Sequence, residues 1–170
     1  MSLRPGRAYH HFAKKPYTRM SSRKPRQSYV KGVPVSKIHQ FETGAVDIKF
    51  PKAYNLVARK EVQMRSNCLE SARISATSYL ISNLGEKGFF LKILTYPHHV
   101  LREKPLATGA GADRFSQGMR RSFGKPIGQA ARVCLGQKVI TVKFFPGAEK
   151  IAKEALRRAA TKLPGSCRIV

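Results

Sequence analysis

The first 36 residues restrict the fold most strongly, because they cannot build a core of their own. They contain nine Lys or Arg and no Asp or Glu, and four prolines interrupt any helical or strand periodicity. The first acidic residue of the chain is Glu42. We therefore expect a basic N-terminal arm over residues 1–36 and a folded domain over residues 37–170.

The rest of the chain alternates between helical and strand patterns. Amphipathic helices are predicted at about 68–83, with Glu70, Arg73 and Thr77 facing outward, and at 148–162. Strands are predicted at 38–41, 45–50, 56–64, 89–96, 133–135 and 138–145, with a further edge strand at 167–170. The alternative for residues 133–145 is one strand with a bulge at Gly136. This pattern predicts an α+β fold, an α/β sandwich in which both helices pack on one face of an antiparallel or mixed sheet.

Residues 101–133 lie between two predicted strands and have no strong periodicity of either kind. They contain five glycines, and seven Lys or Arg against two acidic residues. Arg120, Arg121, Lys125 and Arg132 therefore have few carboxylates to pair with, and such side chains bind phosphate well. A solvated surface loop is the alternative, but the pattern favours a loop that contacts nucleic acid.

The whole chain is strongly basic, with 33 Lys or Arg against 9 Asp or Glu and a net charge of +24. A free protein with this charge repels itself, so we expect a polyanionic partner, with nucleic acid as the first candidate. Aromatic residues such as Tyr9 are interleaved with the cations of the arm, a mixture that suits stacking on exposed bases. Without a partner, the same segment is a disordered basic tail.

An anionic membrane surface is the second candidate partner. The predicted helix at 148–162 argues against it, because its apolar face carries Ala, Ile and Leu rather than Trp or Phe. No apolar stretch of the sequence is long enough to span a membrane, and the N-terminus lacks the apolar core of a signal peptide. We therefore expect a cytoplasmic protein with no membrane partner.

No catalytic or metal-binding set can be assembled from the sequence. The nine acidic residues are spread thinly, and Cys68, Cys134 and Cys167 lack the spacing of a zinc or redox motif, so we expect buried free thiols. We predict no enzyme activity, no cofactor and no metal. Two other classes stay open: an enzyme that modifies or cleaves RNA, and a packaging protein that binds nucleic acid of any sequence.

Four motifs carry a resemblance to a known family. Residues 120–133, RRSFGKPIGQAARV, resemble the signature of the universal large-subunit ribosomal protein called ten-e (QM) in archaea and eukaryotes and sixteen in bacteria. AGADRFSQGM at 110–119, RPGRAYHHFAKKPY near the start and EALRRAATKLPG near the end are similar to its archaeal and eukaryotic branch. The absence of a eukaryotic C-terminal extension after Val170 favours an archaeal-type member.

The sequence departs from the family pattern at two places. Arg121 and Ser122 stand where small residues are expected, and residues 115–117 differ from the expected triplet. The prediction that Arg121 contacts RNA is therefore based on its charge alone.

The resemblance implies an α/β sandwich embedded in large-subunit ribosomal RNA near the aminoacyl- and peptidyl-tRNA sites. It implies that a loop at about 101–118 extends towards the peptidyl transferase centre, and that the protein positions RNA rather than catalysing a reaction. The implied partners are ribosomal RNA, tRNA and neighbouring ribosomal proteins, without homo-oligomers. The predicted rRNA-binding residues are Arg4, Arg7, Tyr9, Lys14, Lys15, Arg23, Lys24, Arg26, Arg114, Arg120, Arg121, Lys125 and Arg132. The predicted tRNA-site residues are Arg102, Lys104, Thr108, Gly109, Ala110, Gly111, Ala112 and Asp113.

Overall fold

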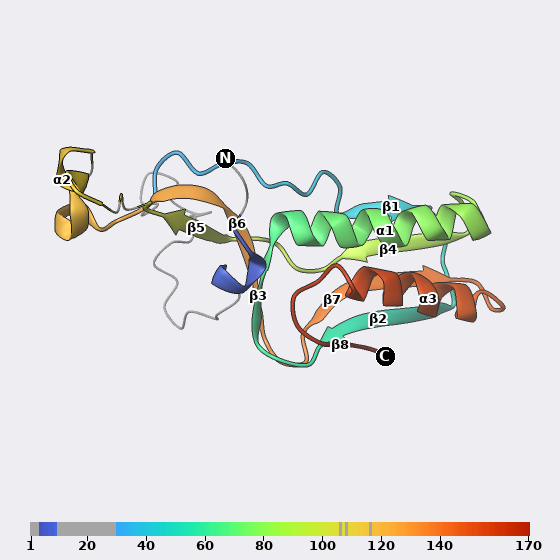
Figure 1. Ribbon diagram of the computed structural model, residues 1–170. Helices are drawn as coiled ribbons and strands as arrows, with labels where there is room; N and C mark the ends of the chain where they lie inside the picture. Colours follow the sequence, from blue (N-terminus) through green and yellow to red (C-terminus); the bar gives the residue numbers. More distant parts are fainter. Residues whose placement is uncertain (1–3, 10–29, 106, 108, 116) are drawn as a thin grey trace.

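The structure, a computed structural model, describes residues 4–9, 30–105, 107, 109–115 and 117–170. Figure 1 shows two parts. The body consists of two long helices that lie over a sheet, and a narrower stem of strands extends from one end of the body.

The sheet of the body has five strands, and every pair of neighbouring strands is antiparallel. In spatial order the strands are β1 (Glu42–Gly44), β4 (Phe89–Ile93), β7 (Lys138–Phe144), β2 (Lys52–Ala58) and β8 (Cys167–Ile169). The last of these confirms the predicted C-terminal edge strand.

The stem is a second, three-stranded antiparallel sheet. In spatial order its strands are β3 (Val62–Arg65), β6 (Lys125–Val133) and β5 (His99–Glu103). Because β3 runs directly into the first long helix, the stem is joined to the body by continuous secondary structure.

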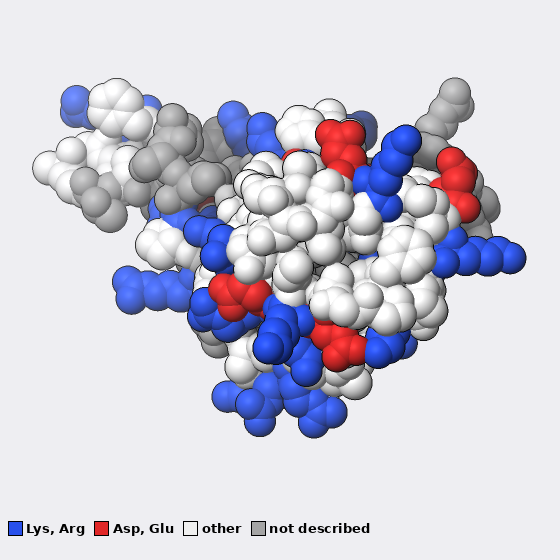
Figure 2. Space-filling view, turned by 90° about the vertical axis from the view of Figure 1, so that its right-hand side faces the viewer, with Lys and Arg blue, Asp and Glu red and all other residues white. Residues whose placement is uncertain are grey.

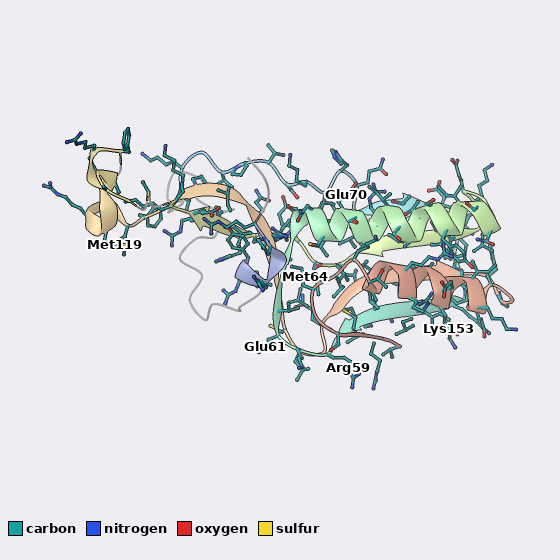
Figure 3. All side chains as sticks on the ribbon, in the orientation of Figure 1. Arg59, Glu61, Met64, Glu70, Met119 and Lys153 are labelled. Atoms are coloured by element: carbon teal, nitrogen blue, oxygen red, sulfur yellow. The ribbon has the colours of Figure 1, made fainter. Side chains whose placement is uncertain are left out.

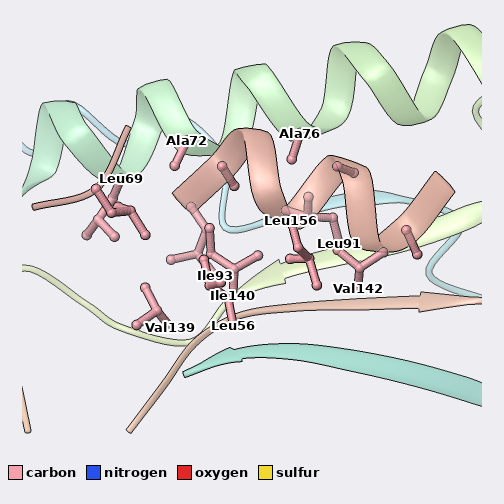
Figure 4. Packing of buried hydrophobic residues seen from close by; sticks show 14 of the residues in the cluster. Leu56, Leu69, Ala72, Ala76, Leu91, Ile93, Val139, Ile140, Val142 and Leu156 are labelled. Carbon is pink, nitrogen blue, oxygen red and sulfur yellow. The ribbon is translucent and has the colours of Figure 1, made fainter. Parts of the chain in front are cut away.

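The two long helices, α1 (Ser66–Leu84) and α3 (Glu149–Ala160), pack on the same face of the five-stranded sheet. Figure 4 shows the layer between them, where Leu69, Ala72 and Ala76 of α1 and Leu156 of α3 lie above Val142 and its neighbours. All five side chains are fully buried. Alanines let the two helices approach each other, and each buried Leu contributes about 1.5–3 kcal/mol through burial. The predicted α+β sandwich is confirmed.

The first predicted strands were placed wrongly. Residues 38–41 and 45–50 were expected to be strands around a turn at Thr43 and Gly44, but that turn is itself β1. Gly44 has a φ of 98°, and a Cβ added there would lie 2.2 Å from the carbonyl oxygen of Phe89. The glycine therefore brings β1 close to β4, whereas sequence rules assign such a residue to a turn.

The strand predicted at 56–64 is two strands in different sheets, because the chain turns between β2 and β3. The strand predicted at 89–96 is shorter, ending at Ile93. It was expected to be apolar on both faces, but Phe90 and Lys92 are only half-buried and alternate with three buried residues. β4 nevertheless has a neighbour on each side.

The largest error concerns residues 101–133, which were predicted to be one long loop. Most of β5 and all of β6 lie within this range, so only residues 104–124 connect the strands. β6 was not predicted as a strand. Its first half is largely exposed and contains Pro126 and Gly128, and both residues weaken a strand pattern.

The outward face predicted for α1 is also wrong. Glu70, Arg73 and Thr77 are 7%, 9% and 8% exposed, whereas Ile74 is 52% exposed. Arg73 donates hydrogen bonds to both carboxylate oxygens of Glu70, at 3.0 and 2.6 Å, and this pairing permits the burial of both charges. The helices otherwise agree with the prediction to within a few residues.

Candidate nucleic-acid interface

The stem presents the connection between β5 and β6 at its far end. This connection contains α2 (Ala112–Phe115) and the 3-10 turn η3 (Gly118–Arg121). We call the described residues of 109–121 the tip. Figure 1 shows α2 far from the long helices, and Figure 3 shows Met119 at the same end. The stem therefore holds the tip away from the body.

Three contacts, one to the tip and two to the residues that follow it, hold the connection between β5 and β6 against the stem. The guanidinium of Arg102 lies 3.8 Å from the centre of the Phe123 ring. Lys104 Nζ donates a hydrogen bond to the carbonyl oxygen of Gly118 at 2.6 Å. Gly124 packs so closely that an added Cβ would lie 2.7 Å from the carbonyl carbon of Glu103. Two of the cations predicted for the tRNA-site loop thus also position the tip.

The tip itself presents cations together with apolar side chains. Arg114 and Arg120 are exposed, as are Phe115 at 88% and Met119 at 72%. An arginine beside an exposed aromatic ring matches the chemistry of single-stranded RNA, because the cation binds phosphate while the ring stacks on a base.

The predicted glycines of the tip have backbone conformations that favour glycine. Gly109 and Gly111 have φ values of 129° and 76°, in the region that L residues rarely adopt. Ala110 is exposed between them, and Ala112 follows as the first residue of α2. This segment therefore offers a path of backbone with almost no side chain.

Positive charge continues along the stem towards the body. Lys125 is exposed and lies opposite Glu103 in the strand register. Arg132 lies opposite Gln63 at the other end of β6. The pKa of His99 is held below its ordinary value, first by burial and then by the positive charges of Arg132 and Arg102.

The described part of the arm packs against the stem. Residues Gly6–Tyr9 form a 3-10 turn, η1. Tyr9 Oη donates a hydrogen bond to Glu103 Oε2 at 3.1 Å, and Gln63 Nε2 donates to the carbonyl oxygen of Tyr9 at 2.8 Å. Arg4 forms an ion pair with Glu103, and Arg65 Nη1 donates to the carbonyl oxygen of Arg4 at 2.8 Å. Arg4 and Tyr9 therefore tie the arm to the stem, while Arg7 is exposed.

Most acidic side chains are already paired within the chain. The ion pairs join Glu42 to Lys92, Glu70 to Arg73, Glu103 to Arg4, Glu149 to Lys52, and Glu154 to both Arg157 and Arg158. Two arginines lower the pKa of Glu154 to about 2. Figure 2, which faces the end of the body remote from the stem, shows that Lys and Arg outnumber Asp and Glu at that end as well. Few carboxylates are left to neutralise the stem.

Comparison with known proteins identifies the family. Residues 13–170 match the family described as "Ribosomal protein L16p/L10e". The chain belongs to this family.

Relatives from archaea match this chain over nearly their whole length. The large ribosomal subunit protein uL16 of Staphylothermus marinus is 49% identical over 170 residues, which cover 100% of this chain and 94% of the relative. The proteins of the same name from Thermofilum pendens and Methanococcus maripaludis are 46% and 44% identical over all of this chain, covering 97% and 94% of their own lengths. The family resemblance found in the sequence motifs is confirmed.

Several predicted site residues of this L16p/L10e protein lie outside the described residues. They are Lys14, Lys15, Arg23, Lys24, Arg26 and Thr108, together with the side chains of Asp113 and Arg121. Of the remainder, the structure gathers Arg102, Lys104 and Lys125 where the stem meets the tip, and places Arg114 and Arg120 on the tip.

Sequence reasoning missed the residues that anchor the arm. Gln63, Arg65 and Glu103 were not singled out, because they are far from the arm in sequence and belong to no motif. Glu103 carried one usable signal, since it is one of only two acidic residues in a basic stretch of 33 residues. An isolated acid in such surroundings is a candidate partner for the basic arm.

The described residues show no sign of a metal site or a membrane span. They contain no group of three or more His, Cys, Asp or Glu that could hold a metal ion. Of the cysteines predicted to be buried free thiols, Cys134 is exposed and Cys68 and Cys167 are half-buried; all three are free. Within the described parts of the chain, no helix is both long and apolar enough to span a membrane.

Proposed function

We propose that this protein is a structural constituent of the large ribosomal subunit. The observation that carries the proposal is the L16p/L10e family match over residues 13–170, which includes the body, the stem and the tip. The protein acts by binding and positioning RNA, and no catalytic role is proposed. Its place of action is the ribosome, with large-subunit ribosomal RNA and neighbouring ribosomal proteins as partners.

The stem and the arm are the proposed rRNA-binding surfaces. Arg120 and Lys125 are exposed, and the tip and the stem have few carboxylates to neutralise them. Phosphate contacts of this kind fix the register of a protein on RNA. Arg4 and Arg7 add contacts on the side where η1 packs against β3. Lys14, Lys15, Arg23, Lys24 and Arg26, which lie outside the described residues, remain proposed rRNA-binding residues of the arm.

The tip is the proposed tRNA-site element. A stem of paired strands holds it away from the body, so it can reach a site that the body cannot enter. Small residues at 109–112 let RNA approach the backbone, and Arg114 supplies charge beside them. We propose that the tip helps organise the aminoacyl- and peptidyl-tRNA sites near the peptidyl transferase centre.

Sedimentation tests the ribosomal assignment. A tagged form of the protein is expressed, and the cell extract is centrifuged through a sucrose gradient in high salt. We expect the protein to sediment with the large subunit in a one-to-one ratio. A protein that stays at the top of the gradient, or that spreads over all nucleic acid, would contradict the proposal and favour a packaging protein.

A deletion tests the tRNA-site assignment separately. Removing residues 108–113 shortens the tip but leaves β5, β6 and the contact between Lys104 and Gly118 in place. We expect normal incorporation into the large subunit, weaker binding of tRNA to the purified particles and slower peptide-bond formation. The substitution Gly128→Ala in β6 is the control, since an added Cβ there meets nothing within 4 Å. Normal tRNA affinity in the deletion particles would overturn the assignment.

A further inference from the structure

The five-stranded sheet has a second face that the long helices do not cover. In β7 the residues Ile140, Val142 and Phe144 are buried beneath the helices, so Thr141 and Lys143 between them point to the other side. In β4, Phe90 and Lys92 do the same. Figure 1 shows both long helices on one side of this sheet. We call the opposite side the open face.

The strand register arranges the side chains of the open face in rows. In one row, Arg168 of β8 and Lys138 of β7 both lie opposite Val57 of β2. A register shift between Leu56 and Val57 interrupts the alternation of β7, so Lys138 lies on the same face as Val57 although it is two residues before Ile140. Since neighbouring strands are about 4.8 Å apart, the Cα atoms of Arg168 and Lys138 lie about 10 Å apart, with both side chains on the same face. In another row, Lys143 lies between Ala53 and Phe90.

Three cations of this face have no carboxylate partner among the described residues, whereas Lys92 is paired with Glu42. Among the described residues, Lys138, Lys143 and Arg168 form no ion pair with Asp or Glu, and all three are exposed. Lys143 Nζ lies 5.5 Å from the centre of the Phe90 ring. Glu42, the acidic residue in the register of this face, is already paired with Lys92.

Two polar side chains on this face, Thr141 and Asn55, hold each other in a fixed orientation. Thr141 Oγ1 donates a hydrogen bond to Asn55 Oδ1 at 2.7 Å, across the β2 and β7 pair. The Asn55 amide nitrogen is then oriented away from that bond and can donate to an acceptor above the sheet. Figure 2 shows Lys and Arg gathered at the lower edge of the molecule, where Figure 1 places β2, β8 and the C-terminus.

We propose that the open face is a further RNA-binding surface, on which Lys138, Lys143 and Arg168 contact phosphates of structured ribosomal RNA. The proposal rests on the proposed ribosomal function and adds a surface opposite the helices, separate from the arm and the tip. Lys138 and Arg168 stand two strands apart, and Lys143 lies five residues further along β7. Phosphate is the ligand that matches these three unpaired cations, and lysine binds it as a point charge.

Other occupants fit this face less well. A membrane surface requires bulky apolar side chains, but the apolar residues in these rows are Phe90, Val57 and Ala53. A second copy of the chain would bring the same cations together, and their repulsion would add to that of a net charge of +24. An RNA backbone satisfies the cations and the Asn55 amide together.

Salt dependence of RNA binding tests the proposal. The triple variant Lys138→Gln, Lys143→Gln, Arg168→Gln is compared with a control triple, Lys87→Gln, Lys150→Gln, Lys162→Gln. The control removes the same charge from exposed lysines in or just after α1 and α3. Affinity for protein-free large-subunit ribosomal RNA is measured over a series of KCl concentrations, and thermal unfolding establishes that both variants are folded.

We expect the slope of log affinity against log salt to fall by about two to three units in the open-face variant, since each lost phosphate contact removes about one unit. The control should change the slope by less than about one unit. An unchanged slope in the open-face variant, or an equal fall in both triples, would overturn the proposal.

A third variant separates this inference from the proposed function. Arg120→Ala together with Lys125→Ala removes cations of the tip and stem only. If that variant loses slope while the open-face variant does not, the open-face proposal fails and the ribosomal function stands. If the unaltered protein binds duplex DNA as tightly as ribosomal RNA, the proposed function fails and the open-face proposal fails with it.

Discussion

Arg73 and Glu70 form a bidentate ion pair inside the face of α1 that meets the sheet. Their side chains are 11% and 10% exposed. Arg73 Nη1 also lies 3.4 Å from Thr43 Oγ1 of β1, at the limit of a hydrogen bond. The pair therefore lies between the first long helix and the edge strand of the sheet.

Breaking this pair should destabilise the protein. In Glu70→Gln, Arg73 keeps its charge in a buried position but loses the carboxylate, so we expect the free energy of unfolding at pH 7 to fall by about 2–3 kcal/mol. Urea unfolding measures the change. Glu154→Gln is the control, because Glu154 pairs with Arg157 and Arg158 on the exposed side of α3 and should matter far less. Equal losses in the two variants would contradict the role given to burial.

The same pair gives stability a defined dependence on pH. Hydrogen bonds from Arg73 lower the pKa of Glu70, and this effect outweighs the opposing one of burial. Because the folded pKa lies below the unfolded value of about 4.3, the contribution is complete above pH 5 or so and is lost as the pH falls through the folded pKa. The difference in unfolding free energy between the unaltered protein and Glu70→Gln should therefore be constant near neutrality and shrink below about pH 4.

Gly124 should be required for the tip to sit correctly on the stem. A Cβ at this position would lie 2.7 Å from the carbonyl carbon and 3.0 Å from the backbone nitrogen of Glu103, so the strands must separate. We expect Gly124→Ala to lower the free energy of unfolding by about 1–3 kcal/mol, the usual effect of overpacking. Hydrogen exchange of the β5 and β6 amides should accelerate at the same time.

Gly128→Ala is the matched control for this experiment. Gly128 lies on the same strand, its φ is not positive, and an added Cβ meets nothing within 4 Å. We expect it to leave stability unchanged or to raise it by about 0.4–1 kcal/mol, because alanine restricts the unfolded chain. If both substitutions destabilise the protein equally, glycine is needed for strand conformation and close packing at Gly124 is not the reason.

The sequence predicted an element correctly where its apolar residues follow a single regular spacing. The apolar stripe of α3 follows helical spacing throughout and continues to Leu163 in the turn after the helix, and the predicted ends of the helix were within two residues of those observed. Reasoning failed on α1 because it treats charged side chains as exposed, which holds unless they are paired. No sequence rule reports that Glu70 and Arg73 satisfy each other and lie under β1.

The stem was missed for a different physical reason. β6 pairs with β3 and β5 at its edges, but the side chains of its first four residues are exposed or only half-buried among the described residues, so this half shows no alternation of buried apolar side chains. Strand pairing through the backbone leaves no trace in side-chain periodicity. Composition alone was enough to single out the charged residues of the site. The structure was needed to show that Arg102 and Lys104 make contacts within the protein, whereas Arg120 and Lys125 are exposed.

The arm should detach locally when Glu103 is neutralised. Glu103→Gln removes the charge that holds Arg4 and weakens the bond from Tyr9 Oη, so we expect local docking to weaken by about 1 kcal/mol. That change corresponds to about fivefold faster tryptic cleavage after Arg7. Glu61→Gln, at an exposed acidic residue with no ion pair among the described residues, should leave the cleavage rate unchanged. Unchanged cleavage in Glu103→Gln would show that the arm is held by other contacts.

Arg120 and Lys125 should each account for one phosphate contact. Both are exposed, and neither forms an ion pair among the described residues. We expect Arg120→Ala and Lys125→Ala each to reduce the salt slope of binding to large-subunit ribosomal RNA by about one unit, while thermal stability stays unchanged. Lys87→Ala, in the exposed turn after α1, serves as the control and should keep the full slope. A full slope in Arg120→Ala would mean that Arg120 faces solvent in the complex, and the rRNA contact of the tip would then have to come from Arg114 and the backbone of Gly109 to Ala112.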